Sequence, residues 1–209
     1  MNAKQEERSN PFGMDEACTN CDLCKTREQV VHGYGDVDAH FLFVGEMPGD
    51  GADETGVPFT GDAAGERLQE ILGRLGLNES PPDAEEPEIE NAFLTYVTRC
   101  RHPERGPTDG EIMTCEPYLN AEIRMINPEI LVPIGEGALA EIATEYTTKP
   151  AADIDIVADH ATTIRGRGFE LVPMIRPENQ TEEQTEAFVQ HFHELMDTDY
   201  RQTKGRQGR

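Results

Sequence analysis

The sequence lacks tryptophan, a long apolar run and any excess of positive charge. No stretch of about 18 apolar residues occurs, so no segment is predicted to cross a membrane as a helix. The first residues, MNAKQEERSN, have no apolar core of the kind found in signal peptides, and we therefore expect a cytoplasmic protein without a membrane partner. A length of 209 residues suits one domain with a sizeable core, and we expect a monomer.

Basic residues are scarce, since 18 Lys and Arg stand against 41 Asp and Glu, for a net charge of −23. Such a charge favours solubility through self-repulsion and argues against a general nucleic-acid binder. Proteins of salt-loving organisms, however, are acidic whatever they bind, and phosphate contacts weaken in salt. An acidic, halophilic composition therefore leaves DNA open as a partner. The C-terminal RQTKGRQGR reverses the sign and predicts a basic, flexible tail.

Strand and helix patterns alternate along the chain. Apolar runs that predict buried strands lie at 41–45, 92–97, 129–135 and 169–175. Helical patterns lie at 65–77, 108–126, 136–146 and 181–196. Thr108 and Glu111 have the spacing of a capping box, and Pro117 predicts a break or kink in that helix. The alternation predicts an α/β fold, with helices on both faces of a central, largely parallel four-stranded sheet.

Cysteine is also rare, yet three of the five cysteines, Cys18, Cys21 and Cys24, lie within one short segment. Their spacing resembles the start of a ferredoxin motif, but the C-x3-C-P continuation is missing. A zinc site made of two C-x2-C pairs lacks its second pair, because fourteen residues separate Cys100 from Cys115. Four thiolates suit either a [4Fe–4S] cluster or zinc, which leaves one cysteine spare. Buried cysteines without a metal are the alternative, but the polar neighbours of the first three favour a metal site.

Three polar segments each follow a predicted strand. They are GEMPGDGADETGVPFTG at 45–61, TRCRHPERGPTDGE at 98–111 and VPMIRPENQ at 172–180. The first holds five glycines and two prolines, so we expect an irregular loop without a regular element. It lacks the G-x4-G-K-[ST] pattern of a phosphate-binding loop. Ligands of parallel sheets bind beyond the carboxyl ends of the strands, so the three segments together predict one site.

Side chains in these segments supply candidate chemistry. Glu46 offers a carboxylate, Phe59 a flat apolar face, and Arg176 a cation before a proline. The middle segment is a basic cluster in an acidic protein, formed by Arg99, Arg101, His102 and Arg105. A plain glycine-rich turn and surface salt bridges are the alternative interpretations of these residues.

Read in order, the motifs resemble those of family 4 uracil-DNA glycosylases, the iron–sulfur members of that superfamily, over roughly residues 15–195. The matching positions are Cys18 and Cys21 with VV-x-G-x-G at 30–35, GE-x-PG at 45–49, the D…G-x-PF-x-G run at 53–61, RCR-x-P at 99–103, and Cys115. The resemblance implies a [4Fe–4S] cluster on Cys18, Cys21, Cys100 and Cys115, with Cys24 spare and zinc as the alternative metal. It also implies a glycosylase domain over 15–197, between a flexible arm at 1–14 and the tail at 198–209.

The resemblance further implies a DNA repair enzyme that flips a uracil, or another deaminated or damaged base, out of DNA and hydrolyses its N-glycosidic bond. It assigns catalysis to Glu46 and Arg176, and substrate binding to Gly45, Met47, Gly49, Phe59 and Tyr96. Candidate phosphate contacts are Arg101, Arg105 and Arg165.

Three positions depart from the family pattern. Tyr96 stands where the family has an asparagine that pairs with uracil, and a phenol cannot supply the paired donor and acceptor of an amide. Arg176 replaces a histidine that stabilises the uracil oxyanion, and His102 replaces a proline. These departures favour, as an alternative, a catalytically altered or inactive member that binds DNA or protein. A zinc-stabilised α/β protein with an unrelated role is the third interpretation.

Overall fold

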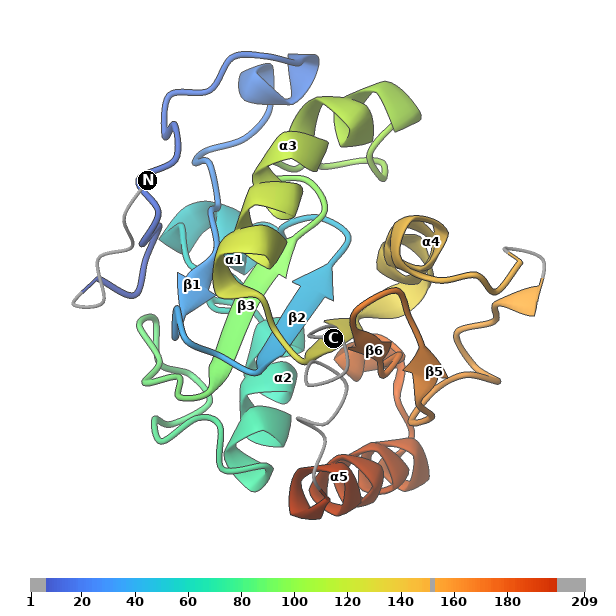
Figure 1. The fold of residues 1–209 in the computed structure, drawn as a ribbon. Coiled ribbons are helices and arrows are strands. Elements are labelled where there is room, and N and C mark those ends of the chain that lie inside the picture. Colours follow the sequence, from blue (N-terminus) through green and yellow to red (C-terminus); the bar gives the residue numbers. More distant parts are fainter. Residues whose placement is uncertain (1–6, 151–152, 199–209) are drawn as a thin grey trace.

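A mixed sheet of six strands forms the centre of the protein (Figure 1). The structure, a computed structural model, describes residues 7–150 and 153–198. The strands are β1 (Tyr34–Gly35), β2 (Phe41–Gly45), β3 (Ala92–Tyr96), β4 (Ile130–Pro133), β5 (Ile164–Arg165) and β6 (Glu170–Leu171). The α-helices are α1 (Asp50–Thr55), α2 (Ala63–Arg74), α3 (Asp109–Ile126), α4 (Gly135–Tyr146) and α5 (Glu182–Asp197), with 3-10 turns η1 (Asp22–Lys25) and η3 (Pro177–Asn179).

The four strands predicted from apolar runs are the four parallel strands of this sheet. They lie side by side in the order β3, β2, β4, β6. The sheet nevertheless has six strands rather than four, because β1 and β5 pair antiparallel with its two outer members. Each added strand is only two residues long, which is too short to produce an apolar run in the sequence.

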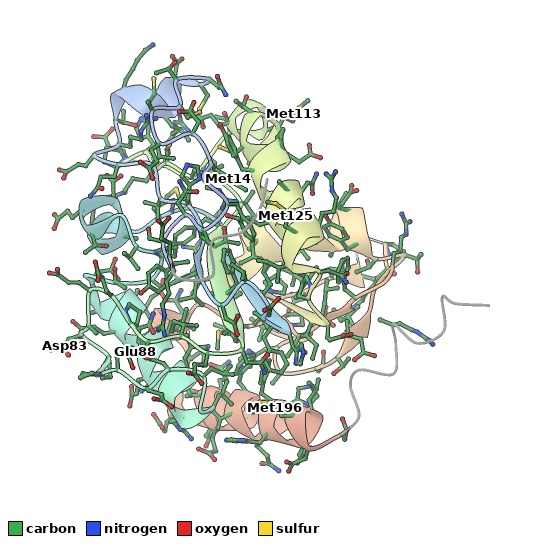
Figure 2. All side chains as sticks on the ribbon, turned by 60° about the vertical axis from the view of Figure 1, so that its left-hand side comes forward. Met14, Asp83, Glu88, Met113, Met125 and Met196 are labelled. Carbon is green, nitrogen blue, oxygen red and sulfur yellow. The ribbon has the colours of Figure 1, made fainter. Side chains whose placement is uncertain are left out.

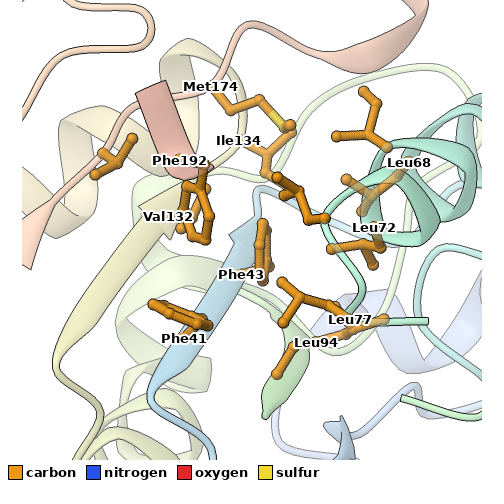
Figure 3. Packing of buried hydrophobic residues seen from close by; sticks show 14 of the residues in the cluster. Phe41, Phe43, Leu68, Leu72, Leu77, Leu94, Val132, Ile134, Met174 and Phe192 are labelled. Carbon is orange, nitrogen blue, oxygen red and sulfur yellow. The ribbon is translucent and has the colours of Figure 1, made fainter. Parts of the chain in front are cut away.

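Alternate residues of β2 face opposite layers of helices, as the pleat of a strand requires. Phe41 and Phe43 pack with α2 and α5, where Leu68, Leu72 and Phe192 meet them (Figure 3). On the other face, Leu42 and Val44 pack with residues of α3 and α4. The predicted α/β fold with helices on both faces of the sheet is therefore confirmed.

The helix α3 begins with the predicted capping box. Thr108 Oγ1 accepts the Glu111 N–H at 3.4 Å, and the Glu111 carboxylate accepts the Thr108 N–H at 2.8 Å. The predicted break at Pro117 is not seen, because the helix runs on to Ile126. An internal proline costs about 3 kcal/mol, and α3 offsets that cost by burying Leu119 and Ile123 against the sheet.

The glycine-rich segment at 45–61 contains a regular element, so the prediction of a purely irregular loop is wrong. Residues Asp50–Thr55 form the short helix α1, which ends at Gly56 in the left-handed conformation at φ 76°. Gly51 lies in the first turn of this helix and the other glycines lie outside it, so the last turn is free of glycine and ends at the left-handed Gly56.

The ends of the chain and the acidic segment at 79–90 complete the fold. Phe12 and Met14, within the arm predicted at 1–14, are buried, while residues 1–6 and 199–209 lie outside the described residues. The segment at 79–90 carries Asp83 and Glu88 outward (Figure 2), and the Tyr34 hydroxyl donates to Pro87 O at 2.9 Å. Within the described part of the chain, no helix is long and apolar enough to cross a membrane.

Candidate active site

A cleft of about 150 Å³ lies at the carboxyl ends of β2, β3 and β4. The sequence-predicted residues that line it are Gly45, Glu46, Met47, Gly49, Phe59, Tyr96 and Arg176. All seven residues predicted to act in catalysis or substrate binding therefore meet in one place. They come from the ends of two strands and from the segment after β6, which agrees with the expectation of one site at the sheet edge.

Glu46 and Arg176 form an ion pair in this cleft, with Arg176 Nη2 donating to Glu46 Oε2. The side chains are 22% and 45% exposed. Both rest on the first turn of α4, where a Cβ on Gly137 would collide with the Glu46 carboxylate and a Cβ on Gly135 would lie 2.8 Å from Arg176 Nε. These two glycines were not singled out from the sequence, although the position of Gly135 at the end of a predicted strand, and of Gly137 just after it, was a usable signal.

The backbone beside Arg176 is fixed by two partly buried polar side chains, His160 and Gln180. His160 Nδ1 accepts the Ile175 N–H at 3.1 Å, so its Nε2 carries the hydrogen that is donated to Gln184 O at 2.9 Å. Gln180 donates to Ile175 O at 2.6 Å. Burial lowers the pKa of His160, which keeps the ring neutral and able to accept. The sequence carried no signal for His160, because it lies in a segment without a motif.

Phe59 and Tyr96 form a second pair in the cleft, with ring centroids 4.6 Å apart. The Phe59 N–H donates to Tyr96 Oη at 2.9 Å, and Gln69 Nε2 donates to Phe59 O at 3.1 Å. These two bonds hold Phe59 in the left-handed conformation at φ 56°, which costs free energy for a residue with a side chain. Gly45 allows the close approach, since a Cβ there would lie 2.7 Å from the Tyr96 ring.

Two further carboxylates, Asp62 and Glu178, line the cleft and were not predicted. Asp62 caps α2 by accepting the Gly65 N–H at 2.8 Å, and it also accepts the Gly51 N–H at 3.2 Å. Burial and, to a smaller extent, these two carboxylates raise the pKa of Tyr96 well above its ordinary value. The phenol is therefore protonated at neutral pH.

The predicted basic cluster is largely paired with carboxylates. Arg99 is buried and donates to Glu122 Oε2 at 2.6 Å. Arg101 pairs with Asp50, and both terminal nitrogens of Arg105 bind Glu111, at 2.8 and 2.9 Å. The Arg105 guanidinium holds the pKa of Glu111 down, at about 2.

Of the predicted phosphate contacts, one borders the cleft and one lies away from it. Arg105 precedes Gly106, where a Cβ would lie 3.8 Å from Glu46 Oε1. Arg165 on β5 lies opposite Glu170, the first residue of β6, in the register of the two strands, and so at the end of the sheet away from the cleft. The structure does not bring Arg165 together with the other site residues.

The cysteine segments are joined through Arg27. Its guanidinium donates to Cys100 Sγ at 3.4 Å and to Cys18 O at 2.7 Å, which ties the N-terminal segment to the loop after β3. Cys18, Cys100 and Cys115 are buried, and none of the five cysteines forms a disulfide. Burial raises the pKa of the Cys100 thiol to about 12 and also raises the pKa values of Cys21 and Cys115.

These thiols are close enough across the two segments that ionisation of one would raise the pKa of another. Cys115 interacts with Cys18 and Cys21, and Cys100 interacts with Cys21 and Cys115, whereas Cys24 interacts with its neighbour Cys21. Within 7–150 and 153–198, however, no three Cys, His, Asp or Glu side chains are arranged to hold a metal ion. The four predicted ligands are thus neighbours without forming a closed coordination sphere.

Comparison with known families decides the identity of the fold. The family model described as the uracil DNA glycosylase superfamily matches residues 32–198. The chain belongs to the uracil DNA glycosylase superfamily. Its match includes the cleft residues from the ends of β2 and β3 and from the segment after β6.

Curated members of the superfamily are similar to this chain over part of their length. A type-4 uracil-DNA glycosylase of Thermotoga maritima is 39% identical over 124 residues, which is 59% of this chain and 59% of that protein. The type-4 enzyme of Archaeoglobus fulgidus is 38% identical over 137 residues, 63% of each chain. A type-5 enzyme of Thermus thermophilus is 34% identical over 113 residues, 53% of this chain and 51% of that one. The matched segments therefore cover less than two thirds of each of these relatives.

Proposed function

We propose that this protein is a DNA repair glycosylase that flips uracil, or another deaminated base, out of DNA and hydrolyses its N-glycosidic bond. The observation that most supports this proposal is the cleft at the carboxyl edge of the sheet. Glu46, Arg176, Phe59 and Tyr96 all line it. The type-4 and type-5 uracil-DNA glycosylases to which the chain is similar support the same reaction. Flipping costs a few kcal/mol, and stacking on the Phe59 ring returns about 1–3 kcal/mol.

Glu46 and Arg176 each carry a charge opposite to the one that develops on one of the two fragments of the substrate. Cleavage leaves negative charge on the departing base and positive character on the sugar. The Arg176 guanidinium stabilises the base anion, and the Glu46 carboxylate stabilises the sugar and orients the attacking water. Entry of the base separates the ion pair, and each partner then faces the charge that develops on the substrate.

We further propose that Cys18, Cys21, Cys100 and Cys115 hold a [4Fe–4S] cluster, with zinc as the alternative metal. The donor set fits such a group, because the four thiols interact electrostatically and Arg27 places a cation beside Cys100. When bound, the cluster joins the N-terminal segment to the loop after β3 and contributes to folding. Because burial raises the pKa values of Cys21, Cys100 and Cys115, loading of a metal would release protons from them.

DNA approaches the cleft past the loop after β3. We propose that Arg105, and Arg101 beside it, exchange their carboxylate partners for backbone phosphates, whereas Arg165 lies too far round the sheet to act with them. The protein works as a cytoplasmic monomer whose acidic surface is adapted to high salt. Each exchanged contact makes binding weaker as salt rises.

A non-cleaving member of the superfamily that binds DNA or protein is the second candidate function. The contact between the Phe59 and Tyr96 rings favours it, because Tyr96 already covers part of the stacking surface. The Glu46–Arg176 pair favours it too, since each group neutralises the other.

Cluster-loaded protein incubated with uracil-containing single- and double-stranded oligonucleotides in high salt separates the two functions. The proposal predicts abasic sites after alkaline cleavage, in oligonucleotides with uracil and not in matched ones with cytosine. Retarded mobility on a gel without abasic sites, at an excess of protein, would instead identify the binding protein.

A further inference from the structure

Tyr96 occupies the end of β3 with its hydroxyl already engaged on one side. The oxygen accepts the Phe59 N–H at 2.9 Å, and the ring lies between Gly45 and Phe59 in the wall of the cleft. The side chain is 3% exposed. Its position is thus fixed from two directions before any ligand binds.

The hydroxyl hydrogen of Tyr96 has no acceptor among the hydrogen bonds found within the described residues. A phenol has one O–H donor besides its acceptor lone pairs, and buried polar groups in proteins are nearly always paired. Burial and the nearby carboxylates Asp62 and Glu178 keep the phenol protonated. Tyr96 therefore offers a ligand in the cleft one donor.

We propose that Tyr96 makes the cleft selective for bases that carry a carbonyl oxygen opposite its hydroxyl. This inference rests on the proposed function and specifies its substrate class. A carbonyl oxygen accepts the Tyr96 hydrogen, whereas an exocyclic amine would meet a hydroxyl oxygen whose lone pairs already face the N–H groups of Phe59 and Gly49. The side chain thus acts as a specificity residue that contacts the base.

Deamination produces the chemical change that such a contact can detect. It replaces the amine of cytosine by the carbonyl of uracil, and the amine of adenine by the carbonyl of hypoxanthine. One hydroxyl tests only that group. The predicted substrate class is therefore bases with a carbonyl at this position, which includes both uracil and hypoxanthine.

The test compares wild type, Tyr96→Phe and the control Tyr34→Phe, each loaded with its cluster. Tyr34 also has a buried hydroxyl, which donates to Pro87 O; it lies on β1 beside β3 but does not line the cleft. The probes are single-stranded oligonucleotides with one 2′-fluoro nucleotide, which resists cleavage because fluorine destabilises positive charge on the sugar. The measured quantity is the ratio of dissociation constants within each pair, cytosine to uracil and adenine to hypoxanthine.

Wild type and Tyr34→Phe are expected to prefer the carbonyl base of each pair by about 10- to 100-fold, the effect of one unpaired buried donor. In Tyr96→Phe both ratios fall toward one. Tyr96→Phe also removes the acceptor of the Phe59 N–H, but a displaced Phe59 weakens the binding of all four bases and leaves the ratios unchanged. A wild-type ratio near one, or an undiminished ratio in Tyr96→Phe, would overturn the proposal.

Parallel cleavage assays on ordinary oligonucleotides keep this result apart from the proposed function. Ratios that collapse in Tyr96→Phe, without cleavage by wild type, would leave the specificity role standing and refute the glycosylase. Cleavage by wild type with ratios that Tyr96→Phe leaves intact would do the reverse. If Tyr96→Phe does not fold, Tyr96→Leu takes its place. Its side chain also lacks a donor, so both ratios should again fall toward one, and undiminished ratios would count against the proposal.

Discussion

The carboxylate of Glu46 and the guanidinium of Arg176 form an ion pair although 130 positions separate them in the chain. Glu46 follows β2 and Arg176 follows β6, so the pair spans the carboxyl edge of the sheet across β4. Both side chains are partly exposed, and pairs of this kind contribute at most about 1 kcal/mol to stability. The pair is therefore inexpensive to open for a substrate.

Arg176→Met should consequently harm the reaction far more than the fold. The rate of base release under single-turnover conditions should fall about 10²- to 10³-fold, the usual effect of losing a group that stabilises a developing anion. The free energy of unfolding in urea should change by less than about 1 kcal/mol. A large loss of stability with an unchanged rate would show that Arg176 has a structural role instead.

Gly137→Ala should displace the Glu46 carboxylate, because the added Cβ would occupy its place. A displacement of about 1 Å at a catalytic group can lower the rate about 10²-fold, while alanine favours the helix by about 1 kcal/mol. We therefore expect a slower but no less stable protein. The control is Gly110→Ala in the first turn of α3, where nothing lies within 4 Å of the new Cβ and the rate should be unchanged. Equal rates in the two variants would show that Gly137 does not position the Glu46 carboxylate.

The hydrogen bonds of His160 predict a loss of stability in mild acid. Its pKa is lowered in the folded protein, so the unfolded chain binds a proton first as the pH falls below about 6.5. The contribution of His160 is thus complete above that pH and is lost as the pH falls toward its folded pKa. Urea unfolding between pH 8 and 5 should show a shallower dependence in His160→Gln than in wild type. Identical pH profiles would mean that the ring does not titrate on unfolding.

Cys100→Ser and Cys24→Ser should differ in iron content and in stability. Cys100 is buried and interacts with Cys21 and Cys115, so its loss should remove the iron and destabilise the fold. Cys24→Ser should keep its iron and labile sulfide. It should also keep a broad absorption at about 400 nm, which is expected of thiolate-bound iron. If Cys24→Ser also loses its iron, the assignment of Cys24 as the spare cysteine is wrong. Stoichiometric zinc in wild type would identify the alternative metal.

The apolar runs were sufficient to predict the core of this fold, and the loop motifs with the family resemblance predicted half of the residues that line the cleft. Continuous apolar runs mark strands buried on both faces, and polar segments at their ends converge by the geometry of a parallel sheet. The short edge strands and α1 escaped prediction because two to six residues give too little periodicity. The unbroken course of α3 through Pro117 depends on tertiary packing, which overrides the local preference for a break.

The site residues that the sequence did not predict are those whose role depends on contacts between distant segments. Gly137 matters because Glu46 rests on it, and His160 matters because it binds the N–H of Ile175. Neither residue type indicates such a role by itself. The carboxylate partners of Arg101 and Arg105 were foreseen only as a general alternative, because the sequence does not specify which acidic residue comes close.

Uracil release under single-turnover conditions, by wild type and Glu46→Gln at an excess of protein over oligonucleotide, tests the central claim most directly. The control is Glu54→Gln, which makes the same charge change at an exposed position on α1. We predict abasic product with wild type and Glu54→Gln, and a rate about 10²- to 10⁴-fold lower with Glu46→Gln. Absence of product from folded, cluster-loaded wild type, or equal rates in all three proteins, would contradict the assignment of a glycosylase site to this cleft.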